Sequence, residues 1–461
     1  MEFFSANVSL NYNVLIKRVV LLALMMVAVH AEATEITTLK QSVDYAVQHN
    51  RLLAADGSAI EQAHARQDMA NGHFLPRVDV STGVTRTDAP GSYFGMRLNQ
   101  QKITAADFSP TFLNNPGYIN NYQTRLNVSM PLYHGGALWA GKRLAEHQGR
   151  SAVMSHASMQ QQIIFQTIQA YARTHQAKAS VTAMKSAVDA AEKRYRDTQA
   201  LHKRGILIDS DVMDAHVHQL RTRLQLKQAE NALAGAMEQL QRVLGIDDIE
   251  GNSNILRVDG EAALSDVTGS LDELVQRAMA QRPDLSALEA ASQASHAEID
   301  QRRAAFMPNV DLVAGQEWNA STPSLKSRNT MIGATVSMNV FAGGTDKARI
   351  RVARAKSIAL ELKIADKKQQ IRHEVSHAWR QLDESRARNA SEQEALKQSE
   401  ESLRIKSLRF QQGLAKTSDL LDAQSQVDQT RLSSIRAGSD VTIAQAALLL
   451  ATGSLHEGVV Q

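Results

Sequence analysis

The five residues from His373 to His377 read His-Glu-Val-Ser-His, a spacing that could hold a metal ion. On a helix this pattern places two imidazoles beside a carboxylate, which is how zinc proteases bind zinc and activate water. The pattern has only three fixed positions, and it arises easily by chance in a chain with 15 histidines. No Gly-x-x-His follows it, and no compact cleft is expected around so long a helix. We therefore expect an ordinary helical segment, with no catalysis, no metal ion and no cofactor.

The overall composition favours long helices and excludes several kinds of site. The 461-residue chain has 8 prolines, 5% aromatic residues and no cysteine. Without cysteine there can be no disulfide, thiolate metal site, cysteine nucleophile or lipid-modified N-terminal cysteine. The formal net charge of +3 is small for this length, so the charge gives no indication of a nucleic-acid partner.

The chain contains an internal duplication. Residues 203–215 return at 411–423 with the glycine, the Ser-Asp pair, a branched apolar residue and the final Asp-Ala in the same places. The same shift of 208 positions pairs Gly135-Gly136 with Gly343-Gly344, Ala170-Tyr171 with Ala378-Trp379, and Gly245 with Gly453. It also matches the His-Glu-Val-Ser-His segment with Phe165–Gln169, which marks that segment as a generic helical position. A fixed period of this kind indicates a repeat architecture.

Residues 1–33 have the features of a signal peptide. Lys17-Arg18 precede an apolar run from Val19 to Val29, and Ala31-Glu32-Ala33 fits a small-x-small cleavage site. A helix needs about 20 apolar residues to span a bilayer, and this run is shorter. We expect the mature chain to be exported, with an uncleaved anchor as the alternative.

The first repeat is expected over residues 34–245. Apolar residues three or four positions apart predict a helix from about 38 to 69. The period then changes to two, which predicts strands at about 77–86 and 122–132. The polar residues 88–121 between the strands read as a long loop.

A very long helix should follow the strands. The helical pattern continues from about 138 to 203, which corresponds to roughly 100 Å. A turn at Gly205 comes next, with Ser210 or Asp211 as the expected N-cap. The following helix, which ends at Leu244, has apolar residues in a coiled-coil spacing. Helices this long must pack laterally against one another.

The second repeat is expected over residues 271–453, after an irregular connector at 246–270 and before a short tail at 454–461. Its elements should be a helix broken at Arg282-Pro283, strands at about 309–318 and 331–341, a second very long helix and a shorter one. The front parts of the two repeats match at a shift of 232 rather than 208. The 24 extra residues therefore fall between the strands of the first hairpin, where an insertion is tolerated.

The strands suggest a membrane pore that several chains share. They alternate apolar with small or polar residues, as expected for strands with one face in lipid and one in water. Known single-chain barrels start at eight strands, and open edges are not tolerated in lipid. Four strands per chain therefore require an oligomer, whose number of chains does not follow from this arithmetic.

The chain resembles the TolC family of outer-membrane efflux and secretion channels, also called outer membrane factors. The resemblance covers residues 38–453 in order and in both repeats. The residues that carry it are Phe74-Leu75-Pro76, Met130–Gly136, Arg282-Pro283-Asp284-Leu285, Val336–Gly344 and Ser418–Gln424.

The resemblance implies a fold that is mainly α with a small β part. It would be a tandem-repeat α-helical barrel of long coiled-coil helices, with four transmembrane β-strands per chain. A homotrimer would then form a 12-stranded β-barrel in the outer-membrane lipid above a periplasmic tunnel. The tunnel would dock onto a periplasmic adaptor protein and an inner-membrane transporter.

The resemblance also implies a gate at the periplasmic end, where rings of acidic residues line the constriction. Asp419 and Asp422 occupy the matching positions, three apart on one face of the first helical turn. Carboxylates crowded by symmetry would attract cations and repel anions. The alternative is that these residues cap the helix and stabilise its dipole. Asp211 and Asp214 in the first repeat are expected to be structural.

The closing contacts of the gate should differ from those of the family's type member. Ala415 and Phe410 stand where that member has an arginine and a tyrosine. Lys416, Arg204 or Lys203 are candidates to substitute, and the alternatives are that other contacts hold the mouth shut or that it is held less tightly. The two turns are also where an adaptor would touch the tunnel. The residues expected there are Gly205, Ser210, Asp211, Gly413, Thr417 and Ser418.

We therefore predict an outer-membrane exit channel of a tripartite efflux pump or type I secretion system, with its tunnel extending into the periplasm. The main alternative is a soluble periplasmic coiled-coil adaptor protein, and a metalloprotease on the His-Glu-Val-Ser-His segment is a more distant one. Drug, metal ion, dye and polypeptide cargoes all remain open at this point.

Overall fold

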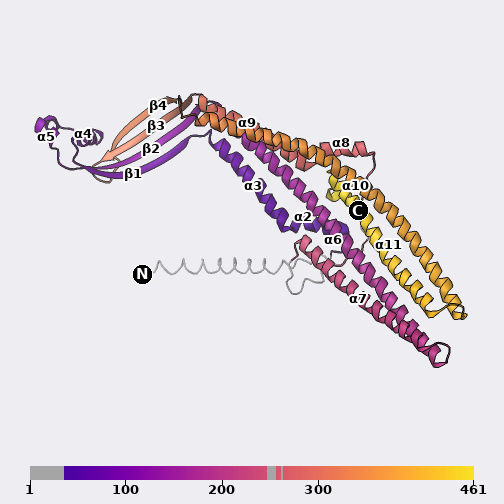
Figure 1. The fold of residues 1–461 in the computed structure, drawn as a ribbon. Coiled ribbons are helices and arrows are strands. Elements are labelled where there is room, and N and C mark those ends of the chain that lie inside the picture. Colours follow the sequence, from indigo (N-terminus) through magenta and orange to yellow (C-terminus); the bar gives the residue numbers. More distant parts are fainter. Residues whose placement is uncertain (1–35, 247–255, 261–262, 461) are drawn as a thin grey trace, which may run out of the picture.

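A computed structural model describes residues 36–246, 256–260 and 263–460. The expected signal peptide at 1–33 lies outside the described residues, as do parts of the expected connector. The molecule is elongated: a β-sheet occupies one end, and paired long helices extend to the other (Figure 1).

The same order of elements occurs twice along the chain. The first half contains α2 (Leu39–His49), α3 (Arg51–Gly72), β1 (Arg77–Thr87), β2 (Ile119–His134), α6 (Ala137–Lys203) and α7 (Asp209–Leu244). The second contains α8 (Leu271–Gln281), α9 (Pro283–Arg303), β3 (Asn309–Ala320), β4 (Ser327–Ser337), α10 (Thr345–Gln411) and α11 (Thr417–Ala451). Short 3-10 turns, η3 (Ala304–Phe306) and η4 (Glu457–Val459), follow α9 and α11. The helices α6 and α10 both have 67 residues.

The helix expected over 38–69 is in fact two helices, broken at Asn50. The Asn50 side chain accepts hydrogen bonds from the backbone N–H groups of Leu52 and Leu53 and donates one to the carbonyl of Val243. Asparagine is a favourable N-cap because its side chain satisfies the free N–H groups of the first turn. The break lies 232 positions before Arg282, where α8 ends and α9 begins. Both repeats therefore bend at the same place by different chemical means.

The four strands form one antiparallel sheet in the order β1-β2-β3-β4. The strand expected at 331–341 actually runs from Ser327 to Ser337, so its predicted end was wrong. The reason is the length of its neighbour: β3 begins at Asn309, which pairs with Ser337. Residues after Ser337 have no strand to pair with, although their apolar alternation continues.

The segment at 88–121 is not an open loop but a small folded lobe. It contains α4 (Pro90–Asn99), the 3-10 turn η1 (Ala105–Phe108) and α5 (Pro110–Asn114). Two edge-to-face aromatic pairs hold it together, Phe94–Phe108 and Tyr93–Phe112, with ring centroids 5.5 and 5.6 Å apart. The lobe lies at the end of the sheet farthest from the helices (Figure 1).

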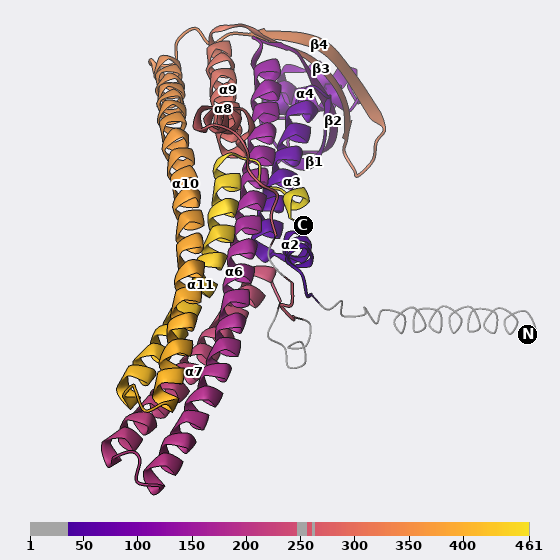
Figure 2. The same ribbon diagram turned by 90° about the vertical axis from the view of Figure 1, so that its right-hand side faces the viewer.

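Two apolar clusters lie midway along the helical part. One joins α2, α3, α6 and α7 with part of α11, and the other joins α8, α9, α10 and α11; Figure 2 shows how these helices are arranged. Tyr171 is fully buried in the first cluster, with its hydroxyl 2.9 Å from the carbonyl oxygens of Thr37 and Gly260. Its counterpart Trp379 is 39% exposed, so the two repeats pack differently here. Among the described residues, no helix is both long enough and apolar enough to cross a membrane.

Candidate functional site

The two helix turns lie together at the end of the molecule opposite the sheet (Figures 1 and 2). Gly205 and Gly413 have φ angles of 75° and 73°, a conformation that L side chains rarely adopt. Each turn is closed by the same pair of backbone bonds: Ile206 donates to Leu201 and Gly205 to His202, with the same pattern around Gly413. This is the Schellman arrangement, which satisfies the last carbonyls of a helix. The duplicated glycines therefore end α6 and α10 in the same way.

The helices after the turns begin on residues that the sequence did not predict as caps. The N-caps are Ile208 for α7 and Lys416 for α11, instead of the expected Ser210 or Asp211. In both helices a carboxylate at the third position accepts a hydrogen bond from the N-cap backbone, at 3.3 Å for Asp211 and for Asp419. The aspartate at the third helical position satisfies the backbone N–H of the N-cap residue, so the helix starts without a polar N-cap side chain. Asp419 is therefore a capping residue as well as an exposed carboxylate.

The other expected docking and gate residues differ in exposure. Ser210, Ser418 and Asp422 are exposed, whereas Thr417 is buried and its hydroxyl has no hydrogen-bond partner among the described residues. Ser418 and Asp422 line a cleft of about 710 Å³ between α7 and α11. The two expected gate residues thus take different places, Asp419 at the helix start and Asp422 facing the cleft.

A buried polar group that the sequence did not predict lies deeper in the same cleft. Asp428 is buried, and burial raises the pKa of its carboxyl, opposed by a hydrogen bond from Gln424 and by the charges of His218 and Arg431. His218 lines the cleft from α7, and burial lowers its pKa. The Nε2 atom of His218 is buried without a hydrogen-bond partner in the described part of the chain. The only signal in the sequence was the helical spacing of Asp428 from Leu421, which predicts an inward-facing position.

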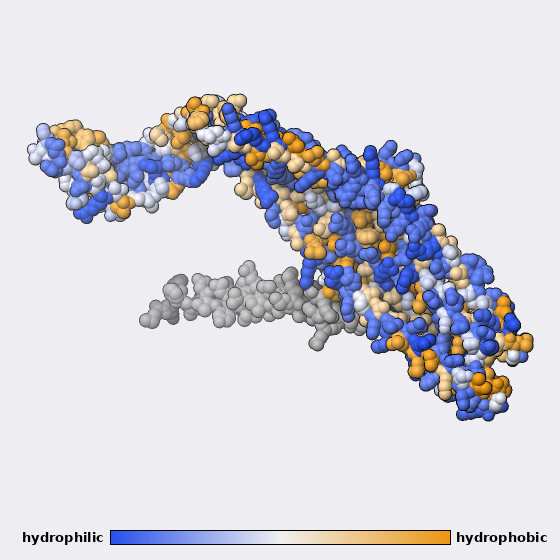
Figure 3. Space-filling view, in the orientation of Figure 1, coloured by the Kyte–Doolittle hydropathy of each residue, from blue (hydrophilic) through white to orange (hydrophobic). Residues whose placement is uncertain are grey.

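Exposed apolar side chains gather at the turns (Figure 3). They are Ile206, Ile208, Met213 and Leu414, each 64 to 68% exposed. The first turn also carries an ion pair between His202 and Asp209, at 2.9 Å. No ion pair of Lys203, Arg204 or Lys416 is recorded within the described ranges. A role of these three cations in closing the gate between chains stays a prediction.

The Arg-Pro-Asp motif at the α8–α9 break forms a charged cluster with α10. Arg282 binds the carboxylates of Asp284, at 2.7 Å, and of Glu374. Lys367 of α10 reaches Asp284 at 2.8 Å. Burial raises the pKa of Asp284, but hydrogen bonds from Arg282 and Lys367 outweigh it and lower the pKa to about 2. The motif therefore fixes the break against the long helix.

This cluster also explains the His-Glu-Val-Ser-His segment. The Glu374 carboxylate, which a zinc protease would use as its base, is bound by Arg282 and by the Gln370 amide. The rings of His373 and His377 stack with centroids 6.3 Å apart. Within the described ranges, no group of three or more His, Asp or Glu side chains could hold a metal ion. The segment is a structural part of α10.

The fold and the paired turns define a class of channel protein. The model of the outer membrane efflux protein family matches residues 43–246 and 274–454, and the chain belongs to this family. It is accordingly an outer-membrane efflux channel, a transport protein and not an enzyme.

Individual relatives and structures agree with this assignment. The chain is 25% identical over 438 residues to protein CyaE of Bordetella pertussis, covering 93% of this chain and 87% of that protein. It is 21% identical over 428 residues to the outer membrane efflux protein BepC of Brucella suis, covering 91% and 86%. The CmeC outer membrane channel of Campylobacter jejuni superimposes with a TM-score of 0.76 at 17% identity, covering 91% of this chain and 86% of that one.

Proposed function

We propose that three copies of this chain form the exit duct of a tripartite efflux pump or type I secretion system. The observation that supports this most is the open sheet. Within the described residues β1 pairs only with β2, and β4 only with β3, so each chain has two free strand edges. Free edges are not tolerated in lipid, and joining β4 of one chain to β1 of the next removes them.

The exposed side chains of the edge strands support a lipid-facing sheet. Val80 on β1 is 71% exposed, and Ile332 and Val336 on β4 are 76% and 69% exposed. Apolar residues on the outer face of a barrel are stabilised by the outer-membrane lipid. Three chains would supply 12 strands, and the number three rests on the resemblance to TolC-like channels. Residues 1–33 would direct export, and the repeats would span 34–245 and 271–453.

The turns at the other end of the molecule would meet the pump. The exposed Ile206, Ile208, Met213 and Leu414 give an apolar surface that a helical hairpin of a periplasmic adaptor protein could cover. The expected docking residues Gly205, Ser210, Asp211, Gly413, Thr417 and Ser418 lie at the same turns. The adaptor would connect the tunnel to an inner-membrane transporter. Asp419 and Asp422 would line the mouth of the tunnel as a cation-attracting gate.

The first experiment is to extract the full chain from membranes in detergent and measure its mass by light scattering. A detergent-dependent trimer from the outer membrane is the expected result. A monomer that is soluble in the periplasmic fraction would contradict the shared barrel and favour the adaptor alternative.

Cysteine cross-linking tests the strand edges directly, because the natural chain has no cysteine to interfere. Single cysteines on β1, such as Val80→Cys, are combined with a scan along β4 that includes Ile332→Cys. An oxidant should link the chains into covalent trimers at one register. Matched pairs on β2 and β3, which face each other inside one chain, should give no linked oligomer.

A further inference from the structure

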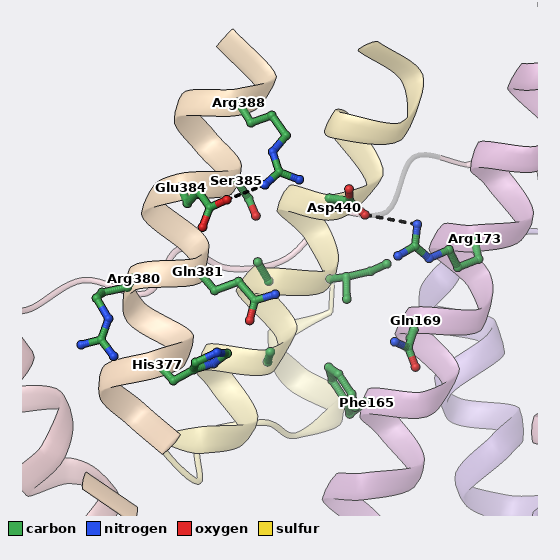
Figure 4. A pocket seen from close by; sticks show the side chains of 13 residues that line it. Phe165, Gln169, Arg173, His377, Arg380, Gln381, Glu384, Ser385, Arg388 and Asp440 are labelled. Carbon is green, nitrogen blue, oxygen red and sulfur yellow. Dashed lines mark hydrogen bonds and ion pairs between the residues drawn. The ribbon is translucent and has the colours of Figure 1, made fainter. Parts of the chain in front are cut away.

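A groove of about 730 Å³ lies between α6, α10 and α11, close to the middle of the helical part (Figure 4). We call it the arginine groove, because three arginines line it: Arg173 from α6, and Arg380 and Arg388 from α10. Two carboxylates line it as well, Glu384 and Asp440. The lining therefore carries an excess of positive charge. The charges of the groove play no part in the turns, in the Arg282 cluster or in the sheet.

The groove opens on one particular face of the helices. Val375, Ala378 and Leu382 of α10 pack into the apolar cluster that contains α8. Arg380, two positions after Ala378, and Arg388, six positions after Leu382, point elsewhere, since these separations correspond to turns of about 200° and about 240° around the helix. On α11, Gln445 donates to the carbonyls of Leu264 and Ser265. The groove therefore opens on the side opposite α8 and residues 264–265.

In the proposed trimeric duct, the position of α8 and residues 264–265 decides which side of the helices faces the tunnel. Elements that cover the middle of the helices would obstruct a tunnel if they lay inside it. The face bearing α8 and residues 264–265 must then be the outer face of the tunnel. The arginine groove would consequently open onto the transported solute, once in each chain. This placement rests on the proposed function, whereas the chemistry of the groove does not.

The arginines retain donors for a ligand. Arg173 reaches Asp440 across the groove at 3.1 Å (Figure 4), and its Nη1 makes this contact and also donates to the Gln176 amide oxygen at 2.9 Å. Arg388 binds Glu384 on its own helix through Nη2. Arg380 donates Nη1 to the Ser376 hydroxyl, also on its own helix. A guanidinium has five N–H donors in a fork that matches carboxylate and phosphate geometry. Each arginine therefore has N–H groups beyond those used in these bonds.

The floor of the groove is apolar. Phe165 of α6 and the side chains of Ile443, Ala444 and Ala447 of α11 line it. Gln169 and Gln381 add amide donors between this floor and the arginines (Figure 4). Binding sites for small molecules commonly combine an apolar surface with a few placed polar groups that fix orientation. A ligand that suits this groove has an apolar body and an anionic end.

We propose that the arginine groove binds amphiphilic organic anions, which place a carboxylate or a similar oxyanion against Arg173 and Arg388 and an apolar body against Phe165. In the channel this would give anionic solutes a binding site on the tunnel wall. Arg380, at the rim of the groove, adds positive potential without direct contact.

Binding is measured by isothermal titration calorimetry on the full chain in a neutral detergent. The probe is naphthalene-2,6-dicarboxylate, and the matched control is 2,6-bis(aminomethyl)naphthalene, which has the same body with positive ends. We expect the dianion to bind and the dication not to bind. Raising the salt concentration from about 0.1 M to about 1 M should weaken binding, because the Debye length falls from about 10 Å to about 3 Å. Equal binding of the dication would overturn the proposal.

Three single variants locate the site. Arg388→Gln should weaken binding about tenfold, since a charge-assisted contact is lost. Glu384→Gln should strengthen binding several-fold, because it frees the donors that Glu384 now occupies. The control Arg354→Gln removes an exposed arginine of α10 about 50 Å from Arg388 along the helix and should change nothing. The ion pair that Arg388→Gln removes joins two residues of the same helix, because Glu384 also lies on α10. Its loss therefore does not weaken a contact between helices. Unchanged affinity in both groove variants would overturn the assignment.

Inorganic phosphate tests whether the apolar floor contributes. It should bind at least about tenfold more weakly than the naphthalene dianion, and equal affinity would show that the floor plays no part. Light scattering on the same samples separates the two proposals. A trimer that fails to bind the dianion overturns only the groove, whereas a monomer that binds it overturns only the duct.

Discussion

Arg282, at the break between α8 and α9, donates a hydrogen bond to the carboxylate of Glu374 on α10, 92 residues further along the chain. The same guanidinium binds Asp284 and reaches the carbonyl of Ala451 at the end of α11. One side chain, 10% exposed, thus connects three helices of the second repeat. Glu374, which a zinc protease would use as its base, is one of the structural partners of Arg282.

Replacing Arg282 by alanine should destabilise the protein. The change leaves two partly buried carboxylates with Lys367 as the one cation paired with them in the described part of the chain, and removing one member of such a cluster costs about 3 to 5 kcal/mol. The melting temperature in detergent should therefore fall by several degrees. The control Arg303→Ala removes an exposed arginine whose ion pair with Asp300 lies within α9, and its effect should stay within about 0.5 kcal/mol. Equal melting temperatures for the two variants would contradict the role of Arg282.

The stability of the fold should depend on pH through Asp284. Its pKa is lowered from 3.8 to about 2, so the ionised form is favoured in the folded state. The resulting stabilisation of about 2 kcal/mol is complete above pH 4 and is lost as the pH falls towards 2. Measuring the free energy of unfolding against pH should show this loss. The loss should be about 2 kcal/mol smaller in Asp284→Asn, where carboxylates such as Glu298, whose pKa is also lowered, still contribute. It should be retained in full in Asp300→Asn, whose carboxylate is about half exposed.

The second turn should be sensitive to a side chain at Gly413. Alanine would meet no neighbouring atom there, but the φ angle of 73° costs an L residue about 1 to 2 kcal/mol. Gly413→Ala should therefore increase hydrogen exchange at the turn. In Gly438→Ala, within α11, the added carbon makes only an ordinary contact with Asn389, and helix stability should rise by up to about 1 kcal/mol. Destabilisation by both variants would indicate crowding rather than backbone strain.

The proposed gate can be tested in planar bilayers. The double variant Asp419→Asn with Asp422→Asn should lower the cation preference of the conductance and reduce block by divalent cations, because six carboxylates leave the mouth of a trimer. Asp209→Asn serves as the control, since Asp209 is an exposed aspartate at the other turn. Unchanged selectivity in the double variant would remove both residues from the gate. An equal effect of the control would indicate a diffuse surface charge instead.

Asp428 should reduce stability at neutral pH. Burial raises the pKa of its carboxyl, so the folded state favours the protonated form, and stability declines as the pH rises through that pKa. Asp428→Asn removes this dependence and should raise the melting temperature at pH 7. The exposed Asp422→Asn should leave it unchanged. A lower melting temperature for Asp428→Asn would show that the charged carboxylate stabilises the cleft.

The sequence by itself determined the duplication and the elements that repeat with it. Helix ends such as Gly205 and Gly413 are local: a glycine that can adopt positive φ and the apolar spacing on either side are sufficient to predict them. The two long helices and the alternating strands follow from patterns within short windows. The break at Asn50 was also local, and its cap could have been recognised from the asparagine itself.

The tertiary structure decided the features that depend on contacts between residues far apart in the chain. The end of β4 at Ser337 is set by the start of β3, and the sequence of β4 alone continues the alternation past it. Whether Glu374 is a base or a structural anion depends on Arg282, and the environment of Asp428 depends on His218 of another helix. Burial and ion pairing arise only when separate segments meet, so no local pattern can specify them.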